Sequence, residues 1–192
     1  LSGSLGADTF NVSGGSLTAN GIAVSGVQNN QVDANGGEDV FSGAANGWSL
    51  TGTANQLTDS IDETYTFTGV TDANLSGQAL AGSGSADTFN VTGGTLTANS
   101  INITSSTNTI NAGGGADVFS GTTSGWSLTN SLNELTDNIF TFTDVTGANL
   151  SGESLAGTTG TDTFDMTDAS LTANGIAVSG VANNQVNANG GE

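Results

Sequence analysis

The chain contains no Lys, Arg or His, so none of its side chains can carry a positive charge. Its 18 Asp and Glu residues give a formal net charge of −18. Because proteins bind nucleic acids largely by neutralising phosphates with cationic side chains, this composition excludes nucleic acid as a partner. It also excludes electrostatic docking on an anionic membrane, and no stretch approaches the roughly 20 apolar residues of a membrane span. The carboxylates must therefore be solvated, hydrogen-bonded or bound to metal ions.

The absence of His, Cys, Lys and Arg also removes most catalytic groups. No imidazole base, thiol, amine or guanidinium is present, which leaves carboxylate pairs as the one remaining route to catalysis. We therefore expect that the chain is not an enzyme. Without Cys no disulfide can reinforce the core. The absence of Pro suits continuous strand ladders, in which every backbone N–H must donate.

Three copies of one sequence unit fill the chain. "LSGSLGADTFNVSGGSLTAN" returns as "LAGSGSADTFNVTGGTLTAN" and again as "LAGTTGTDTFDMTDASLTAN". We divide the chain into repeat 1 (residues 1–79), repeat 2 (residues 80–154) and a partial repeat 3 (residues 155–192). Residues 16–38 and 170–192 differ at only two positions. Because the sequence lacks a starting Met and stops where the earlier copy continues "DVF", we expect a piece of a longer array.

Short runs such as "TFNV", "SLTA", "GIAV" and "WSLT" carry apolar residues two apart, which is typical of strands. Gly, Asn, Ser and Asp clusters separate them, as turns require. The regular spacing of the apolar residues argues against low-complexity disorder, which the 30 Gly would otherwise suggest. We predict an all-β parallel solenoid whose repeats of about 75 residues each make three coils of about 25 residues or four of about 18 to 20. Tandem β-sandwich repeats are the alternative, although the repeats share no evident hairpin dipeptide at a fixed centre.

Five Asp-x-Phe motifs mark candidate corners of the coil. In "NTINAGGGADVFSG" (residues 108–121) and "NNQVDANGGEDVFSG" (residues 29–43), an apolar residue and a Phe lie nine residues apart with Gly and Asp between them. This spacing resembles the nonapeptide G-G-x-G-x-D-x-apolar-x of RTX (repeats-in-toxin) proteins. In that family the Asp carboxylate and the carbonyl oxygens of glycine-rich turns bind Ca²⁺. The resemblance implies calcium ligation by the five aspartates, which are Asp8, Asp39, Asp87, Asp117 and Asp162.

The motif departs from the RTX family because the nonapeptides do not follow one another in tandem. In RTX rolls, calcium is shared between adjacent turns, whereas here other sequence follows each corner. The alternative interpretation is that each Asp only shapes a turn, by accepting hydrogen bonds from backbone N–H groups. The net charge of −18 favours calcium over this alternative, because divalent cations would relieve the repulsion.

Other side chains suggest additional interpretations. Trp48 and Trp126 occupy equivalent "GWSLT" positions, where core packing is the expected role and sugar stacking the alternative. The Thr alternations at residues 64–68 and 141–143 are similar to the Thr rows of ice-binding solenoids, although they occur only once per repeat. Asp62 and Glu63 fall in the part of repeat 1 that repeat 2 lacks, and we interpret them as a solvated loop.

The acidic corners, the Thr, Asn and Gly richness and the missing cations resemble β-strand-repeat regions of giant bacterial surface proteins, such as adhesins, S-layer proteins and filaments. This resemblance implies secretion, an extracellular or cell-surface location and stabilisation by external calcium. We therefore expect a structural segment of a fibre, sheath, matrix or adhesin stalk that self-associates into fibres or arrays. A recognition module that binds extracellular glycans or ice is the alternative function.

Overall fold

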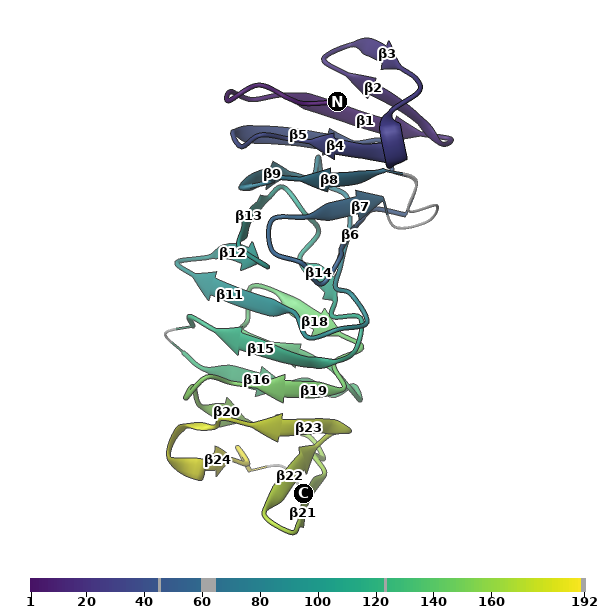
Figure 1. The fold of residues 1–192 in the computed structure, drawn as a ribbon. Helices are drawn as coiled ribbons and strands as arrows, with labels where there is room; N and C mark the ends of the chain where they lie inside the picture. Colours follow the sequence, from purple (N-terminus) through teal and green to yellow (C-terminus); the bar gives the residue numbers. More distant parts are fainter. Residues whose placement is uncertain (45, 60–64, 123, 191–192) are drawn as a thin grey trace. The chain divides into compact units, whose positions relative to one another are not determined.

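A computed structural model describes residues 1–44, 46–59, 65–122 and 124–190 (Figure 1). Asp62, Glu63 and Thr64 lie outside these ranges, so the predicted loop and the first threonine of the 64–68 alternation are not described. The described residues are nearly all β and wind as stacked parallel coils, giving a β-solenoid of about six turns with about 31 residues per turn. This confirms the predicted fold class over the tandem sandwich. In the described part of the chain, no helix has the length and apolar character needed to cross a membrane.

The coils group into two compact units, which do not coincide with the sequence repeats. The first comprises Leu1–Gly82 and Thr95–Thr107, and the second comprises Ser83–Gly94 and Asn108–Glu192. In each unit the strands alternate between two sheets, and their inward side chains form the core. The repeat boundaries follow sequence similarity, whereas the units follow packing.

The first unit has one sheet in the order β12-β13-β9-β5-β1-β2-β3 and a second in the order β10-β6-β7-β8-β4. The first sheet contains β1 (Thr9–Ser13), β2 (Ser16–Ala19), β3 (Ile22–Val24), β5 (Glu38–Ser42), β9 (Asp72–Asn74), β12 (Thr95–Ala98) and β13 (Ile101–Thr104). The second contains β4 (Gln31–Asp33), β6 (Trp48–Leu50), β7 (Leu57–Asp59), β8 (Thr66–Thr68) and β10 (Leu80–Ala81), and the 3₁₀ turn η1 (Gln28–Asn30) precedes β4.

The second unit has the same plan, with sheet orders β21-β22-β23-β19-β15-β11 and β24-β20-β16-β17-β18-β14. Its first sheet contains β11 (Thr88–Thr92), β15 (Ala116–Ser120), β19 (Gly147–Asn149), β21 (Phe164–Thr167), β22 (Ser170–Ala173) and β23 (Ile176–Ser179). Its second contains β14 (Thr109–Asn111), β16 (Trp126–Leu128), β17 (Leu135–Thr136), β18 (Thr141–Thr143), β20 (Leu155–Ala156) and β24 (Val186–Asn187), with the 3₁₀ turn η2 (Ala182–Asn184) before β24.

Each turn of the coil is longer than the sequence pattern predicted. Coils of about 25 or of 18 to 20 residues are wrong, because parallel partners lie about 31 residues apart, as in the pairs Phe10↔Phe41 and Phe89↔Phe119. The extra length comes from strands that fold back before the chain moves to the other sheet. Strands β1, β2 and β3 form such an antiparallel meander, and β6, β7 and β8 form another.

The meanders depend on two-residue hairpins that the alternation of apolar residues alone does not reveal. In repeat 1, Gly14–Gly15 connects β1 to β2 and Asn20–Gly21 connects β2 to β3. All four residues have positive φ, between 48° and 77°, which is what a type I′ hairpin requires. The same two hairpin positions recur in the other repeats, with Gly93–Gly94 and Asn99–Ser100 in repeat 2 and Asp168–Ala169 and Asn174–Gly175 in repeat 3, all at positive φ. The repeats thus share hairpins at fixed centres although the dipeptide itself varies, and these hairpins lie inside a solenoid and not a sandwich.

A cluster of four aromatic rings forms the core of each unit. In the first unit Phe10 stacks on Phe41 with ring centroids 5.5 Å apart, and in the second Phe89 stacks on Phe119 at 5.4 Å. The other two rings of each cluster are Trp48 and Phe67 in the first unit, and Trp126 and Phe142 in the second. All eight rings are fully buried, at 0 or 1% exposure. The two cores are thus the same arrangement built twice.

The two tryptophans differ in the hydrogen bonding of the indole N–H. Trp48 Nε1 donates to Gln78 Oε1 at 2.9 Å, and Gln78 Nε2 donates in turn to the carbonyl of Ala44. In the second unit Glu153 occupies the position of Gln78, and its Oε1 accepts from the Gly121 N–H instead. Trp126 Nε1 is buried without a partner.

We therefore expect Glu153→Gln to stabilise the second unit by about 1 kcal/mol, because glutamine can accept from the indole and donate to a carbonyl. Urea unfolding at neutral pH measures this difference. The reverse change, Gln78→Glu, should cost a similar amount in the first unit. Asp168→Asn, at an exposed site, removes the same charge and is the control. If Asp168→Asn stabilises the chain as much as Glu153→Gln, relief of charge and not the indole bond is the cause.

Candidate functional site: the aspartate corners

The structure separates the five predicted aspartates into two classes. Asp8, Asp87 and Asp162 each follow a short loop and accept hydrogen bonds from the residue four positions earlier. Asp39 and Asp117 instead lie on the neighbouring coil and accept from the backbone of an aspartate of the first class. The parallel registers Thr9↔Val40 and Thr88↔Val118 bring these aspartates together as pairs. Asp162 has no such neighbour among the described residues.

In the first class the carboxylate organises its own loop. Asp8 Oδ2 accepts from the backbone N–H of Ser4 at 2.7 Å and from its hydroxyl at 3.1 Å, while Oδ1 accepts from Asn20 Nδ2 at 2.6 Å. The Asn20 side chain, followed by the Ser4 backbone, lowers the pKa of Asp8. Both oxygens of this carboxylate are therefore occupied within the protein.

The other corners of this class repeat the arrangement. Asp87 accepts from the backbone and hydroxyl of Ser83 at 2.6 and 3.0 Å. Asp162 accepts from the same two groups of Thr158 at 2.6 and 3.1 Å, and from Asn174 Nδ2 at 2.8 Å. A hydroxyl residue four positions before the Asp was the sequence signal for this class, and it is absent before Asp39 and Asp117.

In the second class one carboxylate oxygen is buried and unpaired. Asp39 Oδ1 accepts from the Asp8 N–H at 2.9 Å, and Asp117 Oδ1 accepts from the Asp87 N–H at 3.0 Å. Both side chains are 0% exposed, and the Oδ2 of each has no hydrogen-bond partner. Burial raises the pKa of each of these carboxyls to about 6, against the lowering effect of the backbone N–H.

Close approach between neighbouring coils explains the glycine just before this class of corner. Gly37 has φ of +105°, and a Cβ there would lie 2.5 Å from the carbonyl oxygen of Gly6 on the next coil. Gly115 has φ of +108°, and a Cβ there would meet the Ser85 carbonyl at 2.6 Å. No other residue fits without moving the backbone. These glycines let the coils stack closely at the Asp pair.

Few carboxylate oxygens of these corners lack a hydrogen-bond partner within the protein. Ca²⁺ takes six to eight oxygen ligands, whereas each pair offers one bare carboxylate oxygen, on Asp39 or Asp117. Within the described ranges, no group of three or more acidic, His or Cys side chains could hold a metal ion. The hydrogen bonds favour the turn-shaping role for Asp8 and Asp162. Calcium binding stays a prediction that direct measurement must test.

The structure also shows where the two tryptophans and the alternating threonines lie. Trp48 and Trp126 are buried, so neither ring is available to stack on a sugar. Among the described residues, some of the alternating threonines lie beside other threonines, since Thr141 pairs with Thr109 and Thr136, and Thr66 pairs with Thr58. The parallel partners of Thr66 and Thr143 are instead Gln31 and Asn111, which interrupt these short rows.

No protein-family profile, curated protein or solved structure matches this chain. Inferences about its role therefore depend on the geometry and chemistry of its own residues.

Proposed function

We propose that this chain is a structural segment of an extracellular bacterial fibre, sheath, matrix or adhesin stalk. The observation that supports this most directly is the duplicated core. Four aromatic rings, one buried aspartate and one hydrogen-bonded loop aspartate recur in each unit with nearly the same distances. A sequence that repeats its packing in this way is suited to building an extended structure, because solenoids lengthen by adding such coils.

The composition supports an extracellular location. The chain has no Cys to oxidise and no Lys or Arg at which trypsin-like proteases cut. Its net charge of −18 gives strong mutual repulsion, which external divalent cations relieve. Similarity in composition and motif to β-strand-repeat regions of giant surface proteins points to the same setting.

Immunogold electron microscopy of the producing cells tests the proposal. Antibodies raised against the chain should decorate unbranched fibres or a sheath at the cell surface, and the purified chain should show no saturable binding on a glycan array. Labelling confined to the cytoplasm would contradict the proposal. Saturable glycan binding would replace it with the recognition module.

Calcium dependence is a separate expectation. We expect millimolar Ca²⁺ to raise the thermal unfolding midpoint above its value in a chelator by several degrees, since about 1 kcal/mol shifts the midpoint of a chain this size by about 2–4 °C. NaCl at matched ionic strength controls for simple screening. If Ca²⁺ and NaCl shift the midpoint equally, or not at all, specific calcium stabilisation is excluded.

A further inference from the structure

The pentapeptide Ala-Asn-Leu-Ser-Gly occurs once in repeat 1, at residues 73–77, and once in repeat 2, at residues 148–152. Each copy contains the sequon Asn-x-Ser, which is the acceptor sequence for N-linked glycosylation. Three further sequons begin elsewhere in the chain. The five sequon asparagines all lie on strands of the first sheet of their unit, with Asn11 on β1, Asn74 on β9, Asn90 on β11, Asn102 on β13 and Asn149 on β19.

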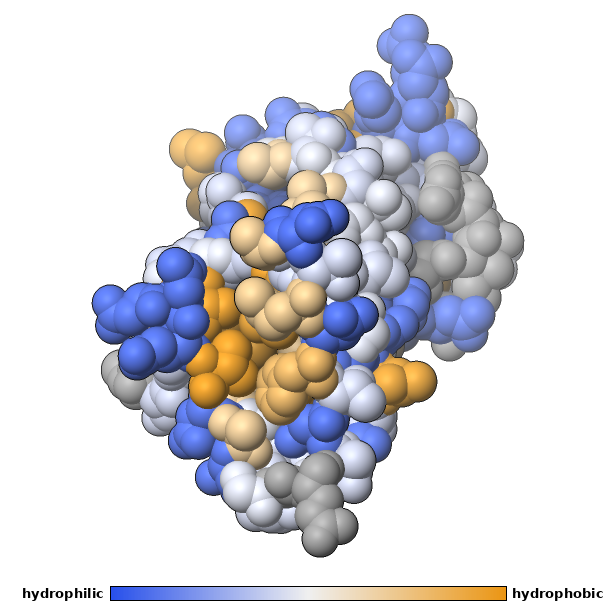
Figure 2. Space-filling model, turned by 90° about the horizontal axis from the view of Figure 1, so that it is seen from below, coloured by the Kyte–Doolittle hydropathy of each residue, from blue (hydrophilic) through white to orange (hydrophobic). Residues whose placement is uncertain are grey.

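Strand alternation turns these asparagines away from the core. The residues on both sides of each one are buried, as Ala148 and Leu150 are beside Asn149. Sugars are bulky and hydrophilic, so they require an outward position on a polar surface. Figure 2 shows hydrophilic side chains around the apolar patch on the face that it views.

In three of the sequons the asparagine amide already donates to a neighbouring strand. Asn11 Nδ2 and Asn90 Nδ2 each donate to a serine hydroxyl at 3.0 Å, and Asn102 Nδ2 donates to Asp72 Oδ1 at 2.8 Å. An N-linked sugar is attached through this nitrogen and replaces one of its two protons. At these three positions the sugar would compete for space with a contact between coils.

The two sequons of the pentapeptide are arranged differently. Asn74 Oδ1 accepts from the Ser76 N–H at 2.9 Å, and Asn149 Oδ1 accepts from the Ser151 N–H at 3.0 Å. Each is an Asx turn formed by the first and third residues of the sequon itself. Within the described ranges, the Nδ2 of neither asparagine donates a hydrogen bond. The side chain is thus held by its oxygen, and its nitrogen is available.

The solenoid holds the turn of Asn149 in place from both sides. Leu150, the middle residue of the sequon, is 0% exposed, and its N–H donates to the Ser179 carbonyl at 2.9 Å. Its own carbonyl accepts from the Glu153 N–H at 2.8 Å. Asn149 and Ser151 are exposed on either side of this buried leucine. An enzyme therefore meets the acceptor amide in a pre-organised conformation, which lowers the entropic cost of binding it.

We propose that Asn74 and Asn149 are acceptors of N-linked sugars, and that a glycosyltransferase modifies them as folded Asx turns with a sugar diphosphate as the donor. The inference rests on the proposed function, since it adds neutral sugars to the outer surface of an extracellular fibre. One sugar-bearing corner lies in each unit, on β9 in the first and on β19 in the second.

The transfer forms one bond and breaks one. The asparagine Nδ2 bonds to the anomeric carbon of the sugar, and the bond between that carbon and the diphosphate oxygen breaks. The diphosphate leaves with the electron pair, and Nδ2 releases one proton to a base of the transferase. Nucleotide-linked and lipid-linked sugar diphosphates share this chemistry. A nucleotide-linked donor delivers a single sugar, whereas a lipid-linked donor delivers a preassembled oligosaccharide.

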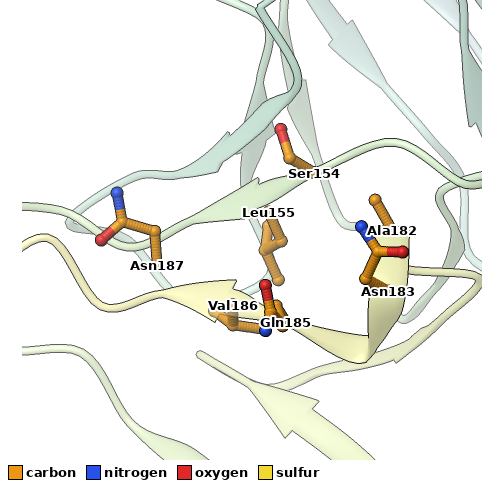
Figure 3. A pocket seen from close by; sticks show the side chains of 7 residues that line it. All are labelled: Ser154, Leu155, Ala182, Asn183, Gln185, Val186 and Asn187. Carbon is orange, nitrogen blue, oxygen red and sulfur yellow. The ribbon is translucent and has the colours of Figure 1, made fainter.

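Other exposed asparagines have the same turn without the hydroxyl residue. Asn111 Oδ1 accepts from the Gly113 N–H at 2.7 Å, and Asn187 Oδ1 accepts from the Asn189 N–H at 3.0 Å. Asn187 also lines an open pocket of about 510 Å³ (Figure 3). Neither asparagine begins a sequon, so both serve as internal controls that separate the effect of the turn from that of the sequon.

Mass spectrometry of the chain purified from the producing cells tests the proposal. Trypsin has no site, but a protease that cuts after Asp and Glu releases residues 73–87 and 145–153, each with one sequon. We expect both peptides to carry a sugar, located by fragmentation on Asn74 and Asn149, and the other three sequons to be unmodified. A single sugar identifies the nucleotide-linked donor and an oligosaccharide the lipid-linked one.

Three variants expressed in the same cells make the result specific. Ser151→Ala keeps Asn149 and the backbone N–H of the turn but removes the sequon, so residues 145–153 should lose the sugar while residues 73–87 keep it. Ser151→Thr preserves the sequon and should keep both sugars. Gly113→Ser creates a sequon within the Asx turn of Asn111, and we expect a new sugar there.

The proposal is overturned if both peptides from the native chain are unmodified, or if the sugar on Asn149 persists in Ser151→Ala. Equal modification of Asn11, Asn90 and Asn102 would also overturn it, because the transferase would then act on the unfolded chain and not on the folded turn. None of these results changes immunogold labelling of surface fibres. Labelling confined to the cytoplasm would instead contradict the proposed function, whatever the sugars show.

Discussion

Phe89→Ala should lower the unfolding free energy of the second unit by about 3–5 kcal/mol, the cost typical of removing a buried aromatic ring. The Phe89 ring is 0% exposed and lies 5.4 Å from the Phe119 ring and 5.1 Å from the Phe142 ring, centroid to centroid. No positively charged residue exists to hold the coils together by ion pairs. The aromatic cluster is therefore one of the contacts that hold neighbouring coils together. Urea unfolding, followed by tryptophan fluorescence, measures the loss.

Phe164→Ala is the matched control for this prediction. Phe164 has the same Asp-Thr-Phe context in the same unit, but it is 37% exposed and lacks the parallel neighbour that covers Phe89. We expect its removal to cost about 1 kcal/mol or less at concentrations where the chain is monomeric. Equal costs at the two positions would mean that the ring cluster does not stabilise the unit as described.

Much of the fold could be predicted from the strand pattern. Runs such as "TFNV" and "WSLT" are strands with alternate residues buried, and burial of Trp48 and Trp126 was the expected role. The turn length was wrong because apolar alternation identifies strands without saying which neighbour each one pairs with. The hairpins at Gly14–Gly15 and Asn20–Gly21 carried that information.

The candidate site was less predictable than the fold. All five Asp-x-Phe motifs look alike in sequence, and yet Asp8 has both carboxylate oxygens occupied while Asp39 has one bare oxygen. The difference arises from residues four positions earlier and from a neighbouring coil about 31 residues away. The spacing within one motif could have revealed the residue four positions earlier. It could not have revealed the neighbouring coil, because that contact depends on the register between coils.

Register also connects the polar layer of the core to its aromatic layer. The same parallel pairing that buries Asp39 beside Asp8 buries Phe41 beside Phe10, so the polar and the aromatic layers of neighbouring coils must align together. A slip of one residue would turn the aspartates and the rings outward at once.

The double variant Asp39→Asn/Asp117→Asn should be more stable than the unmodified chain at pH 7 in the absence of calcium. Burial raises the pKa of both carboxyls from 3.8 to about 6 in the folded chain. Their contribution to stability is therefore fully present below about pH 3.8 and is lost as the pH rises through about 6. We expect the unmodified chain to lose on the order of 2 kcal/mol per carboxyl over this range, and the double variant to show little change.

Asp8 opposes this trend at lower pH. Because hydrogen bonds from Asn20 and Ser4 lower its pKa, its contribution is present above the unfolded value and is lost as the pH falls further. The unmodified chain should thus be most stable near pH 4 to 5, which thermal unfolding in chelator-containing buffers from pH 3 to 8 will measure. Asp168→Asn removes an exposed charge and should leave the slope of stability against pH unchanged between pH 4 and 6.

If the unpaired Oδ2 atoms of Asp39 and Asp117 bind Ca²⁺, the order of stability reverses in millimolar Ca²⁺, and the double variant Asp39→Asn/Asp117→Asn becomes the less stable chain. A variant that is less stable at pH 7 even in chelator would show that the ionised carboxylates stabilise the coil.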